Sequence, residues 1–358
     1  MKKIIVLSLL VIVATGLIGF QIVFNSVSTV NQSKNKWEWV ESEQSLQANQ
    51  FFWDQFHSGN YDTIPAILEK LAAAYLENPN DLKTIYHLGF THFWALSERQ
   101  HLDSVPGTII DHATLALKYL GEAYKMNPDD ARLLSFLSAA KIIVGSLSND
   151  EGLIKDGYLN GLKSIRDWKD FGEFSLAYTL SRLPHTDPNS QKSLEWMEET
   201  TERCYCEDID SKLEECKQKI AQMAENTTNK ERDRIIPNSW VAPHNIEGYF
   251  MFYGDLLVKS GDWEKGKIMY QLAKQAPDYA KWDYKEVLEN RIRNAEKNVE
   301  LFRKEIANGE KVNVDQAIMI NTSISCRTCH QMSKKEFDTK YAGFDQKSYL
   351  DQSFYFLD

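Results

Sequence analysis

The chain of 358 residues lacks the short motifs that mark common nucleotide-binding and hydrolytic sites. It has no G-x-G-x-x-G to cradle a dinucleotide, no H-E-x-x-H to hold zinc and no G-x-S-x-G to present a nucleophilic serine. Basic residues are also few, with 41 Lys and Arg against 51 Asp and Glu and a net charge of −10. Because phosphate binding requires clustered Lys and Arg, this balance argues against a nucleic-acid surface.

Proline and glycine are scarce as well, with 9 Pro and 17 Gly in the whole chain. Between residues 50 and 310 they are confined to junctions, and few strand-like alternations separate them, which predicts one helix after another. Hydrophobic residues make up 43% and charged residues 26% of the sequence, which are ordinary values for a globular protein. We therefore expect an all-α fold rather than a disordered chain.

Charge is absent from the run Ile4 to Phe24, which follows two lysines. As a helix, these 21 residues would be roughly 31 Å long, enough to cross the hydrocarbon core of a bilayer. Lysines before the run favour a cytoplasmic N-terminus, with the rest of the chain on the outer side. We expect residues 1–30 to be a signal anchor or transmembrane helix of a bacterial inner membrane. Residues 31–50 would link it to a body in the periplasm or outside the cell.

A cleaved secretory signal is the alternative to this anchor, and it would leave a secreted periplasmic protein. Such signals have an apolar run of about 7 to 15 residues followed by a small-x-small cleavage site. Ser26-Val27-Ser28 is a poor version of that site. A lipid-attached cysteine is not expected, because no Cys lies near the start of the chain.

Only five cysteines are present, and two of them form the sequence Cys326-Arg327-Thr328-Cys329-His330. This stretch resembles the C-x-x-C-H haem attachment sequence of c-type cytochromes. The resemblance covers these five residues and implies one haem c. Cys326 and Cys329 would form thioethers with the haem vinyl groups, and His330 would bind the iron as the proximal ligand.

The C-x-x-C pair has two other interpretations. A thioredoxin-like redox pair requires a βαβ context, and none surrounds residues 320–328. A structural zinc site requires four ligands, and the other cysteines form no matching pair. In an exported chain, haem is therefore the preferred interpretation, ahead of a disulfide or a metal site.

The remaining cysteines, Cys204, Cys206 and Cys216, lie in a charged segment without a nearby histidine. Because no His occurs between His185 and His244, a metal site here would lack its fourth ligand. We expect one disulfide that joins Cys216 to either Cys204 or Cys206 and closes a local loop. One thiol is left over by either pairing.

A helical hairpin is predicted over residues 247–277. Gly254 lies on its first helix, Gly261-Asp262-Trp263 forms the turn, and Gly266 and Tyr270 lie on the second helix. The unit resembles a tetratricopeptide repeat, in which small residues lie where two helices cross and bulky ones fill the gap. The turn also matches part of the phosphate-loop pattern, but it lacks the closing Ser or Thr and a preceding strand.

Three further units look similar but are less regular. One runs from Leu88-Gly89 to Asn127-Pro128 with about fifteen extra residues, and another from Gly59-Asn60-Tyr61 to Asn78-Pro79. The third, residues 131–167, keeps the apolar rhythm only. Because such units bury their apolar faces on neighbours, we expect a tetratricopeptide-like helical-repeat solenoid whose surface docks a protein partner.

These patterns divide the chain into consecutive parts. After the anchor and linker, repeats occupy 51–183, a charged Cys-containing segment 184–236, a repeat and a capping helix 237–310, and a C-terminal haem-binding segment 311–358. The capping helix is predicted over residues 279–307 and ends at Asn308-Gly309.

A second axial ligand for the iron cannot come from a small domain after the motif, because only 28 residues follow His330. Met332 is too close to the proximal ligand to reach the opposite face. Either an upstream residue binds the iron or the iron is five-coordinate. We favour His244 as the distal ligand, since it follows a proline in a predicted loop. His185, His87, His92 and Met319 are further candidates.

Electron transfer is the function that these features indicate, with a redox or assembly partner on the repeat surface and no catalytic residues. A scaffold or assembly factor, or a haem-based redox or gas sensor, is the alternative, and an open sixth coordination site would favour the sensor. A peroxidase-type enzyme would also require an acid/base group beside the iron. The sequence marks no such group.

Overall fold

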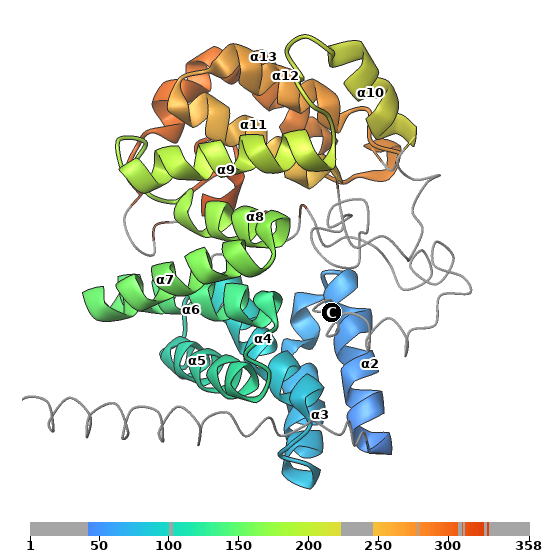
Figure 1. Ribbon diagram of the computed structural model, residues 1–358, viewed down its shortest axis with the longest axis vertical. Helices are drawn as coiled ribbons and strands as arrows, with labels where there is room; N and C mark the ends of the chain where they lie inside the picture. The colour runs from blue at the N-terminus through green and yellow to red at the C-terminus, as the bar shows by residue number, and fades with distance from the viewer. Residues whose placement is uncertain are drawn as a thin grey trace, which may run out of the picture. The chain divides into compact units, whose positions relative to one another are not determined.

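The computed structural model describes residues 42–99, 102, 104–222, 246–277, 279–306, 310, 312–325 and 328. Over these residues the fold consists of twelve α-helices and three short 3-10 helices, without any strand (Figure 1). This confirms the predicted all-α class. The predicted anchor at 1–30 lies outside the described residues.

The helices follow one another with short connections over most of the described chain. In chain order they are α2 (Glu43–His57), η1 (Tyr61–Thr63), α3 (Ile64–Glu77), α4 (Leu82–Glu98), α5 (Ile109–Met126), α6 (Ala131–Ser148), α7 (Glu151–Asp167), α8 (Lys169–Leu180), α9 (Pro188–Cys204), α10 (Leu213–Gln222), α11 (Ile246–Ser260), α12 (Trp263–Ala273), η2 (Tyr279–Lys281), α13 (Lys285–Phe302) and η3 (Met319–Asn321). Helix α2 thus begins within the stretch 31–50 that was predicted to be a linker.

Aspartate side chains begin five of these helices by accepting hydrogen bonds from backbone amides of the first turn. They are Asp81, Asp130, Asp150, Asp187 and Asp262, at the starts of α4, α6, α7, α9 and α12. Each carboxylate also lies at the positive end of a helix dipole, where negative charge is stabilising. The spacing of these aspartates therefore sets where the helices start.

Two Asn-Pro pairs end helices just before such an aspartate. Asn78 has φ −135° and ψ 89°, and Asn127 has φ −131° and ψ 79°, so both have left the helical region. The following prolines explain this, because the residue before a proline is disfavoured in the α conformation. Asp81 and Asp130 then start the next helices. The sequence Asn-Pro-x-Asp is thus a complete turn between two helices.

Glycines with positive φ follow the ends of α2 and α11. Gly59 has φ 61° and Gly261 has φ 113°, a backbone region that favours glycine. In both turns the next residue closes the helix, with Asn60 N donating to Gln55 O at 3.0 Å and Asp262 N to Leu257 O at 2.9 Å. The stretch that partly matched the phosphate-loop pattern therefore begins with the turn between α11 and α12.

Close helix crossings occur at the small residues singled out in the sequence. A Cβ at position 254 would overlap the ring of Tyr270 and lie 3.0 Å from the carbonyl oxygen of Gly266. A Cβ at position 89 would lie 2.7 Å from the backbone nitrogen of Leu120. Glycine therefore lets α11 approach α12, and α4 approach α5, more closely than any other residue would.

Neighbouring helices in the sequence pack against each other along the chain, most extensively in the pairs α4–α5, α6–α7 and α11–α12. Helix α9 belongs to the charged Cys-containing segment and packs on both α8 and α11. In Figure 1, α11, α12 and α13 lie together with α9 beside them. The described part of the charged segment is thus integrated into the helical packing.

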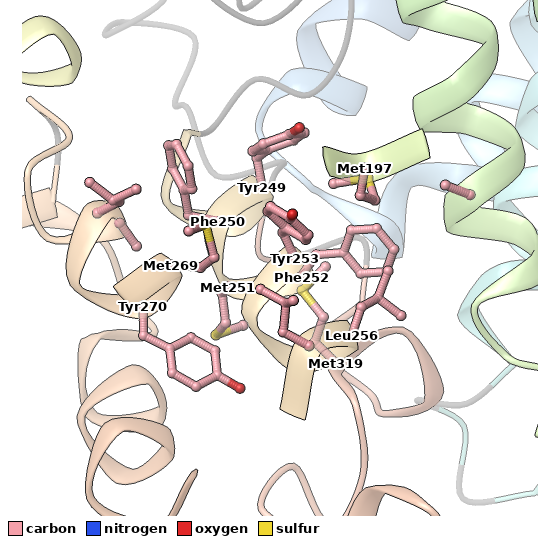
Figure 2. Close-up of a cluster of buried hydrophobic side chains, with 14 of the residues drawn as sticks. Met197, Tyr249, Phe250, Met251, Phe252, Tyr253, Leu256, Met269, Tyr270 and Met319 are labelled. Carbon is pink, nitrogen blue, oxygen red and sulfur yellow. The ribbon is translucent and has the colours of Figure 1, made fainter. Parts of the chain in front are cut away.

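Helix α11 is buried on all sides. Its run from Glu247 to Lys259 contains no exposed residue, and most of its side chains are aromatic or aliphatic. Figure 2 shows Tyr249, Phe252 and Leu256 of this helix in one cluster with Met197 and Met319. A helix that is apolar all round must be covered all round. It is covered by α9, α12, α13 and the 3-10 helix η3.

The predicted capping helix is shorter than expected and is interrupted. The chain forms η2 at Tyr279, leaves helical geometry, and starts α13 only at Lys285, which ends at Phe302. Between these elements Trp282 is 2% exposed and belongs to the main core cluster. Burial of the large Trp282 ring in the core stabilises this interrupted arrangement over one continuous amphipathic helix.

One described helix has the length and hydropathy of a membrane span, namely Ala131–Ser148. More than half of that window is buried inside the protein. Its residues Leu133, Leu134 and Leu137 belong to the protein core. We therefore assign α6 as a core helix.

Replacement of Gly254 by alanine is expected to lower the free energy of unfolding by about 1–3 kcal/mol, because the added methyl group overpacks the crossing with Tyr270. Gly121 on α5 offers a matched control, since nothing lies within 4 Å of its Cβ position. Gly121→Ala should stabilise the protein by about 0.5–1 kcal/mol through helix propensity. Urea unfolding measures both changes. Equal effects of the two variants would contradict the close crossing.

Candidate functional site

The C-x-x-C-H motif is represented among the described residues by Thr328 alone. Cys326, Cys329 and His330 lie outside the described residues, and so does the predicted distal ligand His244. The described part of the site consists of residues 312–325, which lead to the motif, and of Thr328.

The segment before the motif is buried although it contains little regular structure. Ala317, Ile318, Met319 and Ile320 are each at most 2% exposed. Helix η3 packs on α11, and Ile318 and Met319 join the main core cluster of that helix. Burial of these side chains fixes the chain a few residues before the first cysteine of the motif.

A buried carboxylate ties this segment to two helices. Asp255 of α11 forms an ion pair with Arg291 of α13, at 2.7 Å between Oδ1 and Nε, and both side chains are fully buried. The backbone nitrogen of Met319 donates to Asp255 Oδ2 at 2.7 Å. Arg291 Nη2 donates in turn to the carbonyl oxygen of Ala317 at 2.9 Å. The two side chains of this ion pair therefore bind the backbone on either side of Ile318.

Tyr270 of α12 completes this network by donating its hydroxyl to Asp255 Oδ1 at 2.7 Å. Burial raises the pKa of Asp255, while Arg291, the Tyr270 hydroxyl and the Met319 amide oppose that rise. Because a buried charge is costly unless it is paired and hydrogen-bonded, each of these partners is needed to keep the carboxylate in place.

Thr328 is itself fixed to the core from both its side chain and its backbone. Its hydroxyl donates to Ser325 O at 2.9 Å and contacts Met319 Sδ at 3.6 Å. Its carbonyl oxygen accepts a 3.0 Å hydrogen bond from Trp282 Nε1. Thr328 is fully buried, as is the sulfur-bearing Met319. The residue between the two cysteines is thus anchored on the protein core.

Asp255, Arg291, Thr328 and Trp282 were not identified from the sequence as site residues. A signal for Asp255 was present, because it is a single carboxylate inside the apolar run Phe250 to Val258. Such a residue must find a buried partner. The partner could not be found from sequence, since Arg291 lies on another helix among several other basic residues.

The histidine candidates for the distal ligand are distributed over the body. His87 is fully buried on α4, where its Nδ1 lies 2.6 Å from Asn49 Oδ1 and its ring stacks on Phe52. Asn49 donates its amide to Thr84 Oγ1, so its oxygen faces His87 and accepts from Nδ1. His87 therefore has a packing role.

Two other candidates, His92 and His185, differ in burial. His92 on α4 is buried, and its Nδ1 lies 2.9 Å from Nδ1 of His112 on α5. His185 is half-buried between α8 and α9, and its backbone oxygen accepts from Gln191 Nε2 at 2.8 Å. Met319 is engaged by Thr328, as described above.

The structure decides the disulfide that the sequence left open. Cys206 and Cys216 are bonded, with Cα atoms 5.5 Å apart, whereas Cys204 is left outside this bond and is half-buried. One of the two predicted pairings is thus confirmed. Within the described residues, no three His, Cys, Asp or Glu side chains form a group that could hold a metal ion.

The chain matches no protein-family model, no curated protein and no solved structure. Its function must therefore be inferred from its own residues and their contacts.

Replacement of Asp255 by asparagine is expected to lower the free energy of unfolding by about 3–5 kcal/mol, because it leaves Arg291 as an uncompensated buried charge. The amide hydrogen of Met319 should exchange faster as well, since its acceptor is weakened. The matched control is Asp156→Asn, which breaks a pair with Lys141 in which the Asp156 side chain is 57% exposed. That change should cost less than about 1 kcal/mol. Similar losses in the two variants would contradict an anchoring role for Asp255.

Acid should destabilise the protein through His87. Burial, assisted by Lys83, lowers the pKa of His87 well below its ordinary value of 6.5. Below about pH 6.5, His87 therefore binds a proton in the unfolded chain but not in the folded chain. The free energy of unfolding falls as the pH falls. The free energy of unfolding should therefore be smaller at pH 5 than at pH 7.5.

The test compares urea unfolding of the wild type and His87→Asn at pH 7.5 and pH 5. Asparagine retains a donor near Nδ1 but does not titrate, so the variant should lose less stability than the wild type over this range. Parallel pH dependences of the two proteins would show that His87 is not the group responsible.

Proposed function

We propose that the chain is an exported c-type cytochrome that carries one haem and passes single electrons. The observation that carries this proposal is the motif from Cys326 to His330, which directly follows a segment fixed to the core by Asp255. Cys326 and Cys329 would hold the porphyrin covalently, and His330 would bind the iron. When bound, the haem supplies an iron that alternates between two oxidation states.

The contacts of Thr328 support the proposed attachment of haem to the cysteines on either side of it. The Thr328 amide donates to Ile324 O at 3.0 Å, the i to i−4 bond of a helical turn. In such a turn, residues three positions apart share one side, which suits two thiols that must reach one edge of a porphyrin. Thr328 itself is turned into the core. The position between the two cysteines is therefore fixed on the protein core.

An oxidising compartment is part of the proposal. The Cys206–Cys216 disulfide supports it, because such bonds persist outside the cytoplasm and are rare within it. The uncharged run from Ile4 to Phe24 supports export and a membrane anchor at residues 1–30. We therefore place the body on the outer face of a bacterial inner membrane, in the periplasm.

The helical body would serve as a docking scaffold of the tetratricopeptide-like type. Two hairpins support this assignment through equivalent contacts. Gly254 meets Tyr270 sixteen positions later, and Gly89 meets Leu120 thirty-one positions later, which is the same register once about fifteen extra residues are removed. Stacked hairpins of this kind present an extended surface to partner proteins. A redox partner or an assembly partner would bind there.

For the second iron ligand we propose His244. Two of the upstream candidates have other partners, because His87 is held by Asn49 and His92 by His112. The sulfur of Met319 is buried and contacts the Thr328 hydroxyl. His244 follows a proline and lies near the start of α11, the helix on which η3 packs. The optical spectrum of His244→Ala should therefore differ from that of the wild type.

The main test is expression of the full chain in a host that attaches haem c. Because thioethers survive denaturation, the mature protein should stain for haem in a denaturing gel and gain the mass of one haem. It should also show a reversible one-electron couple. The double variant Cys326→Ser, Cys329→Ser should lose the covalent haem completely, whereas Cys204→Ser, a cysteine outside the motif, should retain it.

A colourless, exported protein of unmodified mass would overturn the proposal. A haem protein whose iron stays in one oxidation state over accessible potentials would overturn electron transfer alone. Rapid binding of carbon monoxide to the reduced protein would show that the sixth coordination position of the iron is open. That result would contradict ligation by His244 and favour a gas sensor.

A further inference from the structure

The indole of Trp282 is hydrogen-bonded to the residue that lies between the two cysteines of the motif. Trp282 Nε1 donates to Thr328 O at 3.0 Å, across 46 positions of the sequence. The amide and the hydroxyl of Thr328 bond locally, to Ile324 O at 3.0 Å and to Ser325 O at 2.9 Å. The local bonds shape the turn at residues 324–328, whereas the bond from Trp282 ties that turn to the helical body.

The ring of Trp282 is itself held in place. It is 2% exposed and belongs to the main core cluster. The rings of Tyr279 and Tyr284 lie beside it, with centroids 6.3 Å and 5.9 Å from its own. Because a buried donor without a partner is costly, rotation of the indole away from Thr328 is disfavoured. The direction of this N–H is therefore fixed by the core.

Attachment of haem makes a geometric demand on the turn. Each thiol adds across one vinyl group, so that sulfur bonds to one vinyl carbon, the thiol proton passes to the other, and no electron is gained or lost. Once the first thioether has formed, the second thiol must lie close to its own vinyl group. A turn that is fixed in advance favours this second addition, because less conformational freedom is lost at that step.

We propose that Trp282 is a positioning residue of the haem site, which holds the turn between Cys326 and Cys329 so that both thiols react. The inference rests on the proposed function, because it concerns attachment of the same haem. Trp282 acts through Thr328 and takes no part in making the bonds. Its contacts join protein groups alone, so the turn is set before haem is attached.

Two replacements separate the N–H group of Trp282 from the volume of its ring. Trp282→Phe keeps a bulky ring without a donor. Trp282→His keeps a donor, because its Nε2 takes the place of the indole nitrogen, but loses the six-membered ring. Trp196→Phe is the matched control, since Trp196 is 5% exposed in the same core cluster. All variants also carry Cys204→Ser, so that only the motif supplies thiols outside the Cys206–Cys216 disulfide.

The readout is the number of unreacted thiols on haem-bearing chains. Each protein is denatured without reductant, alkylated with iodoacetamide and analysed by mass spectrometry. In Trp282→Phe the share of chains with an alkylated motif thiol should rise roughly fivefold, the factor for one neutral hydrogen bond. Trp282→His and Trp196→Phe should stay near the wild-type share. Urea unfolding should give the opposite order for the two Trp282 variants, with Trp282→His the less stable because it buries less apolar area.

Complete attachment in Trp282→Phe, or equal losses of attachment in both Trp282 variants, would overturn the positioning role and leave the haem proposal standing. If Trp282→Phe does not fold, Trp282→His still decides, because a raised share of alkylated thiols in a variant that retains the donor would contradict the proposal. A wild-type protein without covalent haem would overturn the proposed function and this inference together.

Discussion

The buried ion pair between Asp255 and Arg291 is the interaction on which the C-terminal half of the described chain depends. It joins α11 to α13, and the same two side chains bind the backbone at Ala317 and Met319. A segment with little regular structure is thereby bonded to two helices. Because an unpaired charge in this position would be strongly destabilising, the pair specifies one arrangement of the chain leading to Thr328 and excludes others.

Helix α11 provides the setting for this interaction. It is buried on every side, and the glycine at position 254 lets Tyr270 of α12 come close enough to donate its hydroxyl to Asp255. Close packing and polar satisfaction therefore depend on each other in this core. The proposed haem motif follows a part of the chain whose side chains are buried and whose backbone is hydrogen-bonded to Asp255 and Arg291. Such rigidity suits a redox centre, whose ligands must not rearrange as the iron changes charge.

The N-terminal part of the described chain is organised by different means. Its turns are formed by Asn-Pro-x-Asp sequences, and its polar groups are arranged in small sets such as His87 with Asn49 and His92 with His112. The first set is buried and serves packing. The second joins α4 to α5 through a hydrogen bond between the two rings, with His92 buried and His112 half-buried.

The sequence by itself determined the helical class, the turns at Gly59 and Gly261, the close crossings at Gly89 and Gly254, and the motif of the proposed haem site. These features are local, because capping, glycine conformation and apolar periodicity act over a few residues. Only the tertiary structure decided which cysteine pairs with Cys216, where the predicted capping helix is interrupted, and that Asp255 meets Arg291. Each of these depends on residues far apart in the chain that only the packed core brings together.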